Sequence, residues 1–93
     1  MIERVDGRLQ VRAPMTIPNA NGLLDAGRQL FQGEREVIDL AAVGEIDSSA
    51  LAVLLGWLRS AQAKGCVLQV INAPSGMRAL ADLYGIDEIL ALA

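Results

Sequence analysis

The sequence lacks histidine and contains a single cysteine, with one residue each of Trp, Tyr and Phe. Without histidine, a Ser-His-Asp triad, histidine metal ligation and histidine general-base catalysis are all excluded. The lone cysteine, Cys66, cannot form a disulfide within the chain, and its place before an apolar run indicates a small core residue. The chain also contains no G-x-S-x-G elbow and no glycine-rich phosphate loop. We therefore expect no enzymatic activity, no cofactor and no metal site.

Hydrophobic residues make up 53% of the 93 residues but aromatic residues only 3%, so the core must consist of Leu, Ile, Val and Ala. This length fits one small domain, residues 1–93. The formal net charge is −3 and the basic residues are scattered, which predicts no nucleic-acid binding. No run approaches the ~20 apolar residues of a membrane span. The first residues do not form a signal peptide pattern either, so we expect a cytoplasmic protein.

The apolar pattern predicts an α/β domain. Residues 9–13 alternate between apolar and polar, which is typical of a strand with one wet face, here carrying Arg8, Gln10 and Arg12. Nearly continuous apolar runs at 36–40 and 67–71 predict fully buried parallel strands, joined by a right-handed crossover through a long helix. We therefore expect about four strands in a mixed sheet, with helices mostly on one face.

Three helices are predicted by apolar residues that recur at helical spacing. One begins near Pro18 and ends at Gly33, and the long one runs from Ser49 to Lys64 with Gly65 as its cap. A third covers about residues 75–84, and the last residues, 86–93, form another turn or two. The inward-facing residues expected in the third helix are Met77, Leu80, Ala81 and Tyr84.

The junction before the long helix is the candidate functional site. It contains Asp47, Ser48 and Ser49, beyond the carboxyl end of a predicted strand, where open α/β sheets place functional groups. A helix N-terminus has unpaired N–H groups and a partial positive charge, which a hydroxyl, a carboxylate or a phosphate satisfies. One interpretation is that these residues only cap the helix. The other is that an exposed hydroxyl pair forms a docking site.

The long helix also has a second apolar side. A surface helix should be polar opposite its buried leucines, but this one carries Val53, Gly56 and Trp57 there. Tryptophan is enriched at binding hot spots, and glycine permits close approach of another backbone. Either Trp57 packs against a neighbouring helix of the same domain, or a partner-binding face runs from Ser48 down the helix.

Several segments together resemble the STAS domain family. They are Val37–Leu40, Ile46–Leu51, Lys64–Ile71 and Leu83–Ile86. This family includes anti-sigma-factor antagonists and the cytoplasmic tails of sulfate transporters. Within it, the short length, the very apolar helix and the Leu-Tyr-Gly-Ile segment are similar to the MlaB-like subunits of the Mla phospholipid-transport ABC system.

The resemblance implies a non-enzymatic subunit that binds the ATPase of an ABC transporter for phospholipids and helps maintain outer-membrane lipid asymmetry. Such a subunit lies at the inner face of the inner membrane and contacts the membrane only through the complex. The expected partner-binding residues are Asp47, Ser48, Ser49, Val53 and Trp57.

Two alternatives remain open. In anti-sigma-factor antagonists, a partner kinase phosphorylates the first serine of an Asp-Ser-Ser/Thr-Gly motif, which would here be Ser48, with Ala50 at the glycine position. A third alternative is a domain that binds a small ligand or lipid.

Overall fold

The computed structural model describes residues 1–90 and 92, except for the side chains of residues 87 and 88. The elements in chain order are β1 (Ile2–Val5), β2 (Arg8–Val11), the 3-10 turn η1 (Ile17–Asn19), α1 (Ala20–Leu30), β3 (Arg35–Asp39), α2 (Ser49–Ala63), β4 (Val67–Ile71), α3 (Ser75–Leu83) and α4 (Asp87–Leu90). The four strands form one sheet in the order β1-β2-β3-β4, with β1 antiparallel to β2 and the other pairs parallel. The predicted α/β domain with a four-stranded mixed sheet is confirmed.

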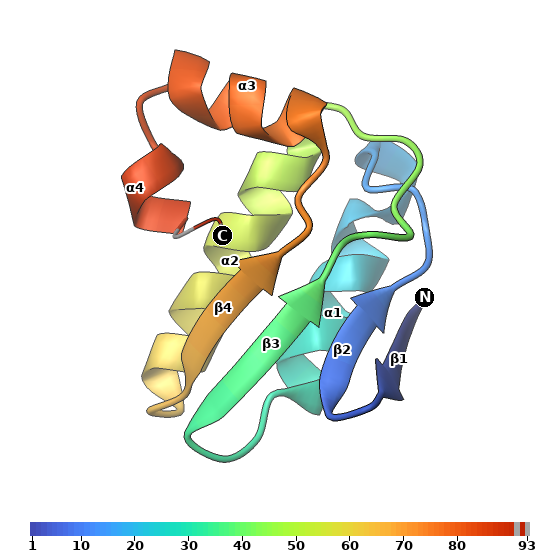
Figure 1. The fold of residues 1–93 in the computed structure, drawn as a ribbon. Helices are drawn as coiled ribbons and strands as arrows, with labels where there is room; N and C mark the ends of the chain where they lie inside the picture. Colours follow the sequence, from blue (N-terminus) through green and yellow to red (C-terminus); the bar gives the residue numbers. More distant parts are fainter. Residues whose placement is uncertain (91, 93) are drawn as a thin grey trace.

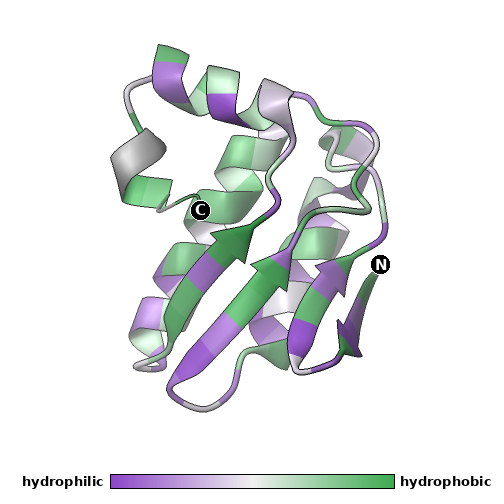
Figure 2. Ribbon diagram, in the orientation of Figure 1, coloured by the Kyte–Doolittle hydropathy of each residue, from purple (hydrophilic) through white to green (hydrophobic). Residues whose placement is uncertain are grey.

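One face of the sheet is covered and the other is open. Figure 1 shows α1 and α2 packed together behind the sheet, with α3 and α4 beside the upper end and outer edge of β4. The predicted alternation in β2 is confirmed, because Leu9 and Val11 are fully buried under the helices. Arg8 and Arg12 are exposed on the opposite face, where Arg12 pairs with Glu3 at 3.0 Å. Figure 2 shows the same alternation as bands of opposite hydropathy along β2.

The one-sided cover corrects the prediction that the run 67–71 is fully buried. In β4 burial alternates, with Leu68 and Val70 in the core and Val67 and Gln69 on the open face. The side chain of Val67 is 61% exposed. The valine at position 67 concealed this period of two, which only Gln69 signals in the sequence, because an open face also tolerates an apolar residue.

Helix α2 is buried on two sides, which corrects the interpretation of its second apolar face. Val53 and Trp57 have an exposed fraction of 0%, so they do not line a surface that a partner can reach. The indole N–H of Trp57 donates a hydrogen bond to the backbone oxygen of Leu23 in α1, at 2.9 Å. Its ring also meets Phe31 edge-on, with centroids 6.3 Å apart. The alternative, in which Trp57 packs against a neighbouring helix, is therefore confirmed.

Gly65 ends α2 as predicted, and Gly85 follows α3 in the same backbone conformation. Gly65 and Gly85 have φ angles of +70° and +69°, the left-handed conformation that ends a helix at little steric cost. Met77 and Ala81 of α3 are buried as expected. The prediction that Tyr84 faces inward is wrong: α3 ends at Leu83, and Tyr84 lies exposed in the turn that leads to α4.

The contact between α1 and α2 gives a first prediction, on two glycines of α1. A Cβ added at Gly27 would lie 2.2 Å from Nε1 of Trp57, whereas one at Gly22 would approach only the flexible side chain of Met1, at 3.4 Å. We expect Gly27→Ala to lower the free energy of unfolding by about 1–3 kcal/mol, because overpacking displaces the indole from its hydrogen bond. Urea unfolding, followed by Trp57 fluorescence, measures the change.

Gly22→Ala is the matched control. It should raise the free energy of unfolding by up to about 1 kcal/mol, because alanine has the higher helix propensity and the space is available. Equal effects of the two substitutions would show that the approach of Trp57 to α1 does not constrain position 27.

Candidate functional site

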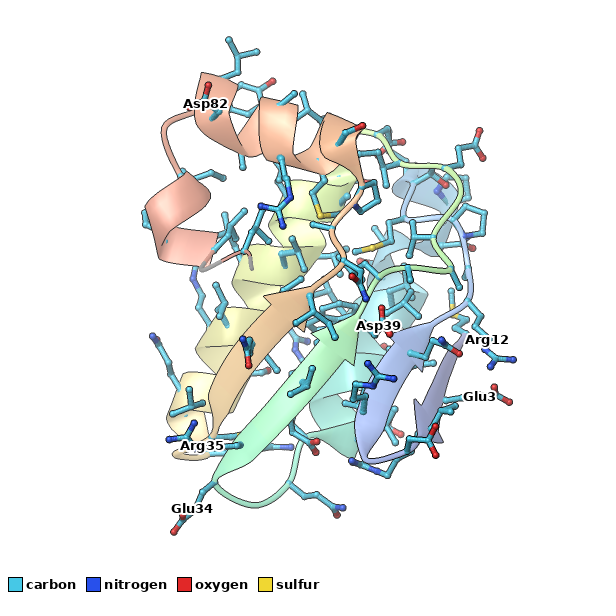
Figure 3. All side chains as sticks on the ribbon, in the orientation of Figure 1. Glu3, Arg12, Glu34, Arg35, Asp39 and Asp82 are labelled. Atoms are coloured by element: carbon cyan, nitrogen blue, oxygen red, sulfur yellow. The ribbon has the colours of Figure 1, made fainter. Side chains whose placement is uncertain are left out.

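The loop that leads to Ser48 starts from a fixed strand end. Asp39, the last residue of β3, is buried, and its Oδ1 accepts hydrogen bonds from the Ala41 N–H at 2.9 Å and the Asn72 amide at 3.0 Å. The Asn72 hydrogen bond, followed by that of Ala41, lowers the pKa of Asp39. Figure 3 shows Asp39 at the upper end of β3, close to the end of β4. The carboxylate thus joins the ends of β3 and β4 at the base of the loop.

Further along the loop, a short strand-like contact joins the residues before α2 to the segment around Met15. The N–H of Met15 donates to the oxygen of Glu45 at 2.9 Å, and the N–H of Asp47 donates to the oxygen of Met15 at 3.2 Å. Ile46 forms a parallel bridge with Met15, whose side chain is fully buried. Residues 45–47 are therefore held beside the segment that follows β2, although no strand was predicted there.

Asp47 connects the start of α2 to η1. Its Oδ1 accepts hydrogen bonds from the Ser49 N–H, at 2.9 Å, and from the Ser49 hydroxyl. Its Oδ2 accepts one from the Ile17 N–H at 3.0 Å. These bonds, the Ser49 hydroxyl first and the Ile17 N–H second, lower the pKa of Asp47. Asp47 thus supplies the capping oxygen that a helix N-terminus requires, and the same carboxylate fixes the position of Ile17.

The hydroxyl of Ser48 does not contribute to holding the turn. Its side chain is exposed and makes no capping hydrogen bond, and none of the described residues pairs with its Oγ. Ser49 is half-buried, and its hydroxyl is bound to Asp47. The expected hydroxyl pair is therefore split: Ser49 belongs to the cap, and Ser48 faces solvent.

The exposed side of α2 differs from the one expected from the sequence. Exposed or half-buried residues follow Ser48 at i+4, i+7 and i+11, namely Ala52, Leu55 and Arg59. This stripe contains small and apolar side chains with one cation at its far end. Sequence reasoning missed it because apolar residues surround the helix, so the pattern alone could not identify which side the other helices cover.

Ile17 is a second residue that the sequence analysis missed. Its side chain is 72% exposed, and its N–H is bonded to the Asp47 carboxylate at the start of α2. A large exposed apolar side chain whose backbone N–H is bonded to Asp47, the residue before Ser48, is a candidate anchor for a partner. No signal of this exposure exists in the sequence, since Ile17 continues the period of two formed by Leu9, Val11, Ala13 and Met15 and so resembles a residue of the buried face.

The groups around Ser48 are already engaged in holding the turn. Among the described residues, no group of three or more Asp, Glu and Cys side chains is placed to hold a metal ion. The Asp47 carboxylate, which lies nearest Ser48 in sequence, is occupied by Ser49 and Ile17. No described helix has the length and apolarity needed to cross a bilayer. What remains at the surface is the exposed Ser48 hydroxyl, the exposed side chain of Ile17 and the stripe of α2 that begins at Ala52.

A comparison with known families identifies the fold. The sequence model described as "Mlab, STAS domain" matches residues 2–92. The chain belongs to the STAS domain family. The resemblance inferred from the sequence is thereby confirmed, and the match includes the N-terminal third. Among curated proteins, none matches this chain.

Solved structures of similar fold include proteins described as anti-sigma factor antagonists and a sulfate transporter family protein. A Thermotoga maritima protein described as an anti-sigma factor antagonist has a TM-score of 0.77 at 21% identity, covering 99% of this chain and 83% of that one. A sulfate transporter family protein from Wolinella succinogenes has a TM-score of 0.68 at 16% identity, over 87% and 67% of the two chains. The antagonist SpoIIAA in its unphosphorylated form has a TM-score of 0.63 at 16% identity, over 96% of each chain. At these identities the similarity establishes the fold alone.

The hydrogen bonds of Asp47 predict how stability depends on pH. Since the folded state lowers the pKa of Asp47, its ionised form stabilises the fold above the ordinary aspartate pKa of about 4. That contribution is lost as the pH falls through this value toward the lower folded pKa. We expect Asp47→Asn to lower the urea midpoint at neutral pH, and the difference from wild type to shrink as the pH falls below about 4.

The pKa values of Glu36 and Asp39 are also lowered, but wild type and Asp47→Asn both retain these residues. The difference in urea midpoint between the two proteins therefore reports the contribution of Asp47 alone. Asp25→Asn, at an exposed aspartate of α1, is the control and should shift the midpoint little. A difference that is independent of pH would mean that the charge of Asp47 does not stabilise the cap.

Proposed function

We propose that this chain is the non-enzymatic STAS subunit that binds the ATPase of an ABC transporter for phospholipids, and that the Ser48 end of α2 is its docking surface. We define this surface as Ile17, Ser48, Ala52 and Leu55. In this proposal the protein acts at the inner face of the inner membrane, reaches the membrane only through the transporter, and supports outer-membrane lipid asymmetry.

The observation that carries the proposal is the free hydroxyl of Ser48. Asp47 caps α2, so fold stability does not require the Ser48 hydroxyl, which is exposed. The exposed Ile17 is bonded through its N–H to the same Asp47 carboxylate. Small side chains at Ser48 and Ala52 let another backbone approach closely, and Ile17 offers the large apolar contact that interface centres use. The description of the family model, which names MlaB, favours a transporter ATPase as the partner.

The first test introduces charge at Ser48. Ser48→Glu should weaken binding to the ATPase by at least ~10-fold, because a carboxylate beside Asp47 would be buried in the interface without a partner. Ser48→Ala should change the affinity by less than ~3-fold, since it removes only a hydroxyl. Titration of the purified ATPase against each variant by calorimetry gives the dissociation constants.

The controls use matched exposed positions. Gln29→Glu adds the same charge on the exposed side of α1 and should leave the affinity unchanged. Ile17→Ser should weaken binding about as strongly as Ser48→Glu. Leu83→Ser removes a side chain of similar exposure, 75% against 72% for Ile17, and should have no effect. Equal affinities for wild type, Ser48→Glu and Ser48→Ala would remove Ser48 from the interface.

A second candidate is an anti-sigma-factor antagonist switched by phosphorylation of Ser48. One observation favours it: Ala50, at the glycine position of that motif, is fully buried, so its methyl group does not alter the surface around Ser48. A phosphate there would add a charge of about −1.5 to −2 next to Asp47.

Intact mass spectrometry of the protein purified from its native cells separates the two candidates. Stoichiometric phosphate that disappears in Ser48→Ala supports the antagonist. An unmodified mass, from cells in which the protein co-purifies with the transporter ATPase, supports the transporter subunit.

A further inference from the structure

The carboxylate of Asp39 is a buried charge that lies outside the Ser48 surface. Asp39 is in register with Gln10 of β2 and Ile71 of β4, on the open face of the sheet, and yet only 4% of it is exposed. Burial of a carboxylate is costly unless hydrogen bonds compensate for the lost water. Oδ1 accepts the two hydrogen bonds described above, and Oδ2 lies 3.7 Å from Nη1 of Arg8.

Both donors to Oδ1 belong to connections between the sheet and its helices. Ala41 begins the loop that leads to α2, and Asn72 begins the connection that leads to α3. Figure 1 shows these two connections leaving the same end of the sheet. One carboxylate oxygen therefore holds both connections at the point where they leave the strands.

Asn72 adopts a backbone conformation that this hydrogen bond helps to hold. Its φ angle is +56°, in the left-handed region that favours glycine and that asparagine tolerates better than most residues. The conformation turns the chain from β4 towards α3 and costs free energy, which the surrounding contacts must offset. The bond from Nδ2 of Asn72 to Asp39, at 3.0 Å, is such a contact.

The two connections meet again just before Ser48. A Cβ built at Gly76, in the first turn of α3, would lie 3.5 Å from Cδ1 of Ile46. Ile46 also forms the parallel bridge with Met15. The end of the loop that leads to α2 is therefore supported both by α3 and by the segment that follows β2.

These contacts close a ring. It runs from Asp39 to Asn72, along the chain to Gly76, across to Ile46 and back along the loop to Asp39. If the Asp39–Asn72 bond opens, the connection to α3 is no longer fixed at its start. The support that α3 gives to Ile46, two residues before Ser48, is then weakened as well.

We propose that Asp39 and Asn72 are the positioning pair of the Ser48 surface: their hydrogen bond holds the first turn of α3 against Ile46 and so keeps the start of α2 in the geometry that binds the partner. Without the bond, the surface retains all its side chains but adopts the binding geometry for only part of the time. The apparent affinity of the partner falls in proportion to that population. The coupling itself is a property of the fold, and only its effect on binding rests on the function proposed above.

Amide hydrogen exchange, followed by NMR on the full chain, tests the coupling without a partner. Asn72→Gly removes the side-chain amide, and glycine adopts the same φ angle freely. We expect exchange to become at least ~10-fold faster at Met15 and Asp47, whose N–H groups form the strand-like contact, and to stay unchanged at Val67, whose N–H is bonded to Glu34 at the other end of the sheet. Unchanged exchange at Met15 and Asp47 would overturn the proposal. An equal acceleration at all three amides would also overturn it, because it would show only a loss of global stability.

Two further variants isolate the hydrogen bond. Asp6→Gly is the matched control, because Asp6 is the other non-glycine residue of the described chain with a positive φ angle, +51°, and lies in the turn between β1 and β2. It should leave the exchange at Met15 and Asp47 unchanged. Asp39→Asn retains an acceptor oxygen for Ala41 and Asn72, so exchange should remain within ~3-fold of wild type.

The affinity for the transporter ATPase, measured by calorimetry, is the second readout. Asn72→Gly should weaken binding at least ~5-fold, which corresponds to a binding-competent population of about one fifth. Asp6→Gly and Asp39→Asn should change it by less than ~2-fold. Cys66→Ser controls for stability, because it buries a hydroxyl at the far end of β4 and should leave the affinity of the folded protein unchanged.

The two proposals fail in different ways. If Ser48→Glu weakens binding and Asn72→Gly does not, the positioning pair is overturned and the docking surface stands. If Ser48→Glu has no effect on binding, the docking surface is wrong, and the exchange rates in Asn72→Gly decide the coupling without it.

Discussion

The packing of Trp57 against α1 is the contact on which the arrangement of the helices depends. A sheet covered on one face offers a shallow core, and the largest side chain in the sequence must be enclosed between the two long helices. Gly27 allows this, because any Cβ there would overlap the indole, whose N–H is bonded to the oxygen of Leu23 at 2.9 Å. Gly56 does the same from the other helix, where a Cβ would meet Leu24 at 2.4 Å. The close contact that Gly27 and Gly56 allow between α1 and α2 fixes the rotation of α2 about its own axis. This rotation determines which residues of α2 are exposed to solvent.

With this rotation, the first turn of α2 lies at the edge of the sheet where the parallel strands end. Asp47 accepts hydrogen bonds from Ser49 there, so the hydroxyl of Ser48 is the one that stays exposed. A carboxylate with two oxygens can cap a helix and hold a second segment at once, which a serine hydroxyl cannot do as well. Because Asp47 bonds to Ser49 and Ile17, the Ser48 hydroxyl is not needed for capping. Asp47 thus stabilises the turn, whereas Ser48 provides the exposed hydroxyl of its surface. A change at Ser48 can alter what the surface binds without removing the hydrogen bonds that hold the turn.

The parts of this structure that could be predicted from sequence depend on local chemistry. The alternation of Leu9 and Val11 and the glycine caps at Gly65 and Gly85 follow from one strand period and one backbone conformation. The errors concern residues whose environment comes from distant segments. Trp57 is buried by α1, some thirty residues earlier in the chain, and Asp47 is the cap partly because Ile17 needs an acceptor. Val67 and Tyr84 are apolar or aromatic residues in exposed positions, and no periodicity distinguishes these from core positions.

The Ser48 surface lies at one end of the sheet. Ser48 follows the carboxyl ends of the parallel strands, whereas Arg35 and Val67 are the first residues of β3 and β4. Five-residue strands separate these ends by roughly 16 Å, within a chain whose extents are 32 × 24 × 22 Å. A partner seated on the first turn of α2 therefore contacts the carboxyl ends of the parallel strands and not their opposite ends.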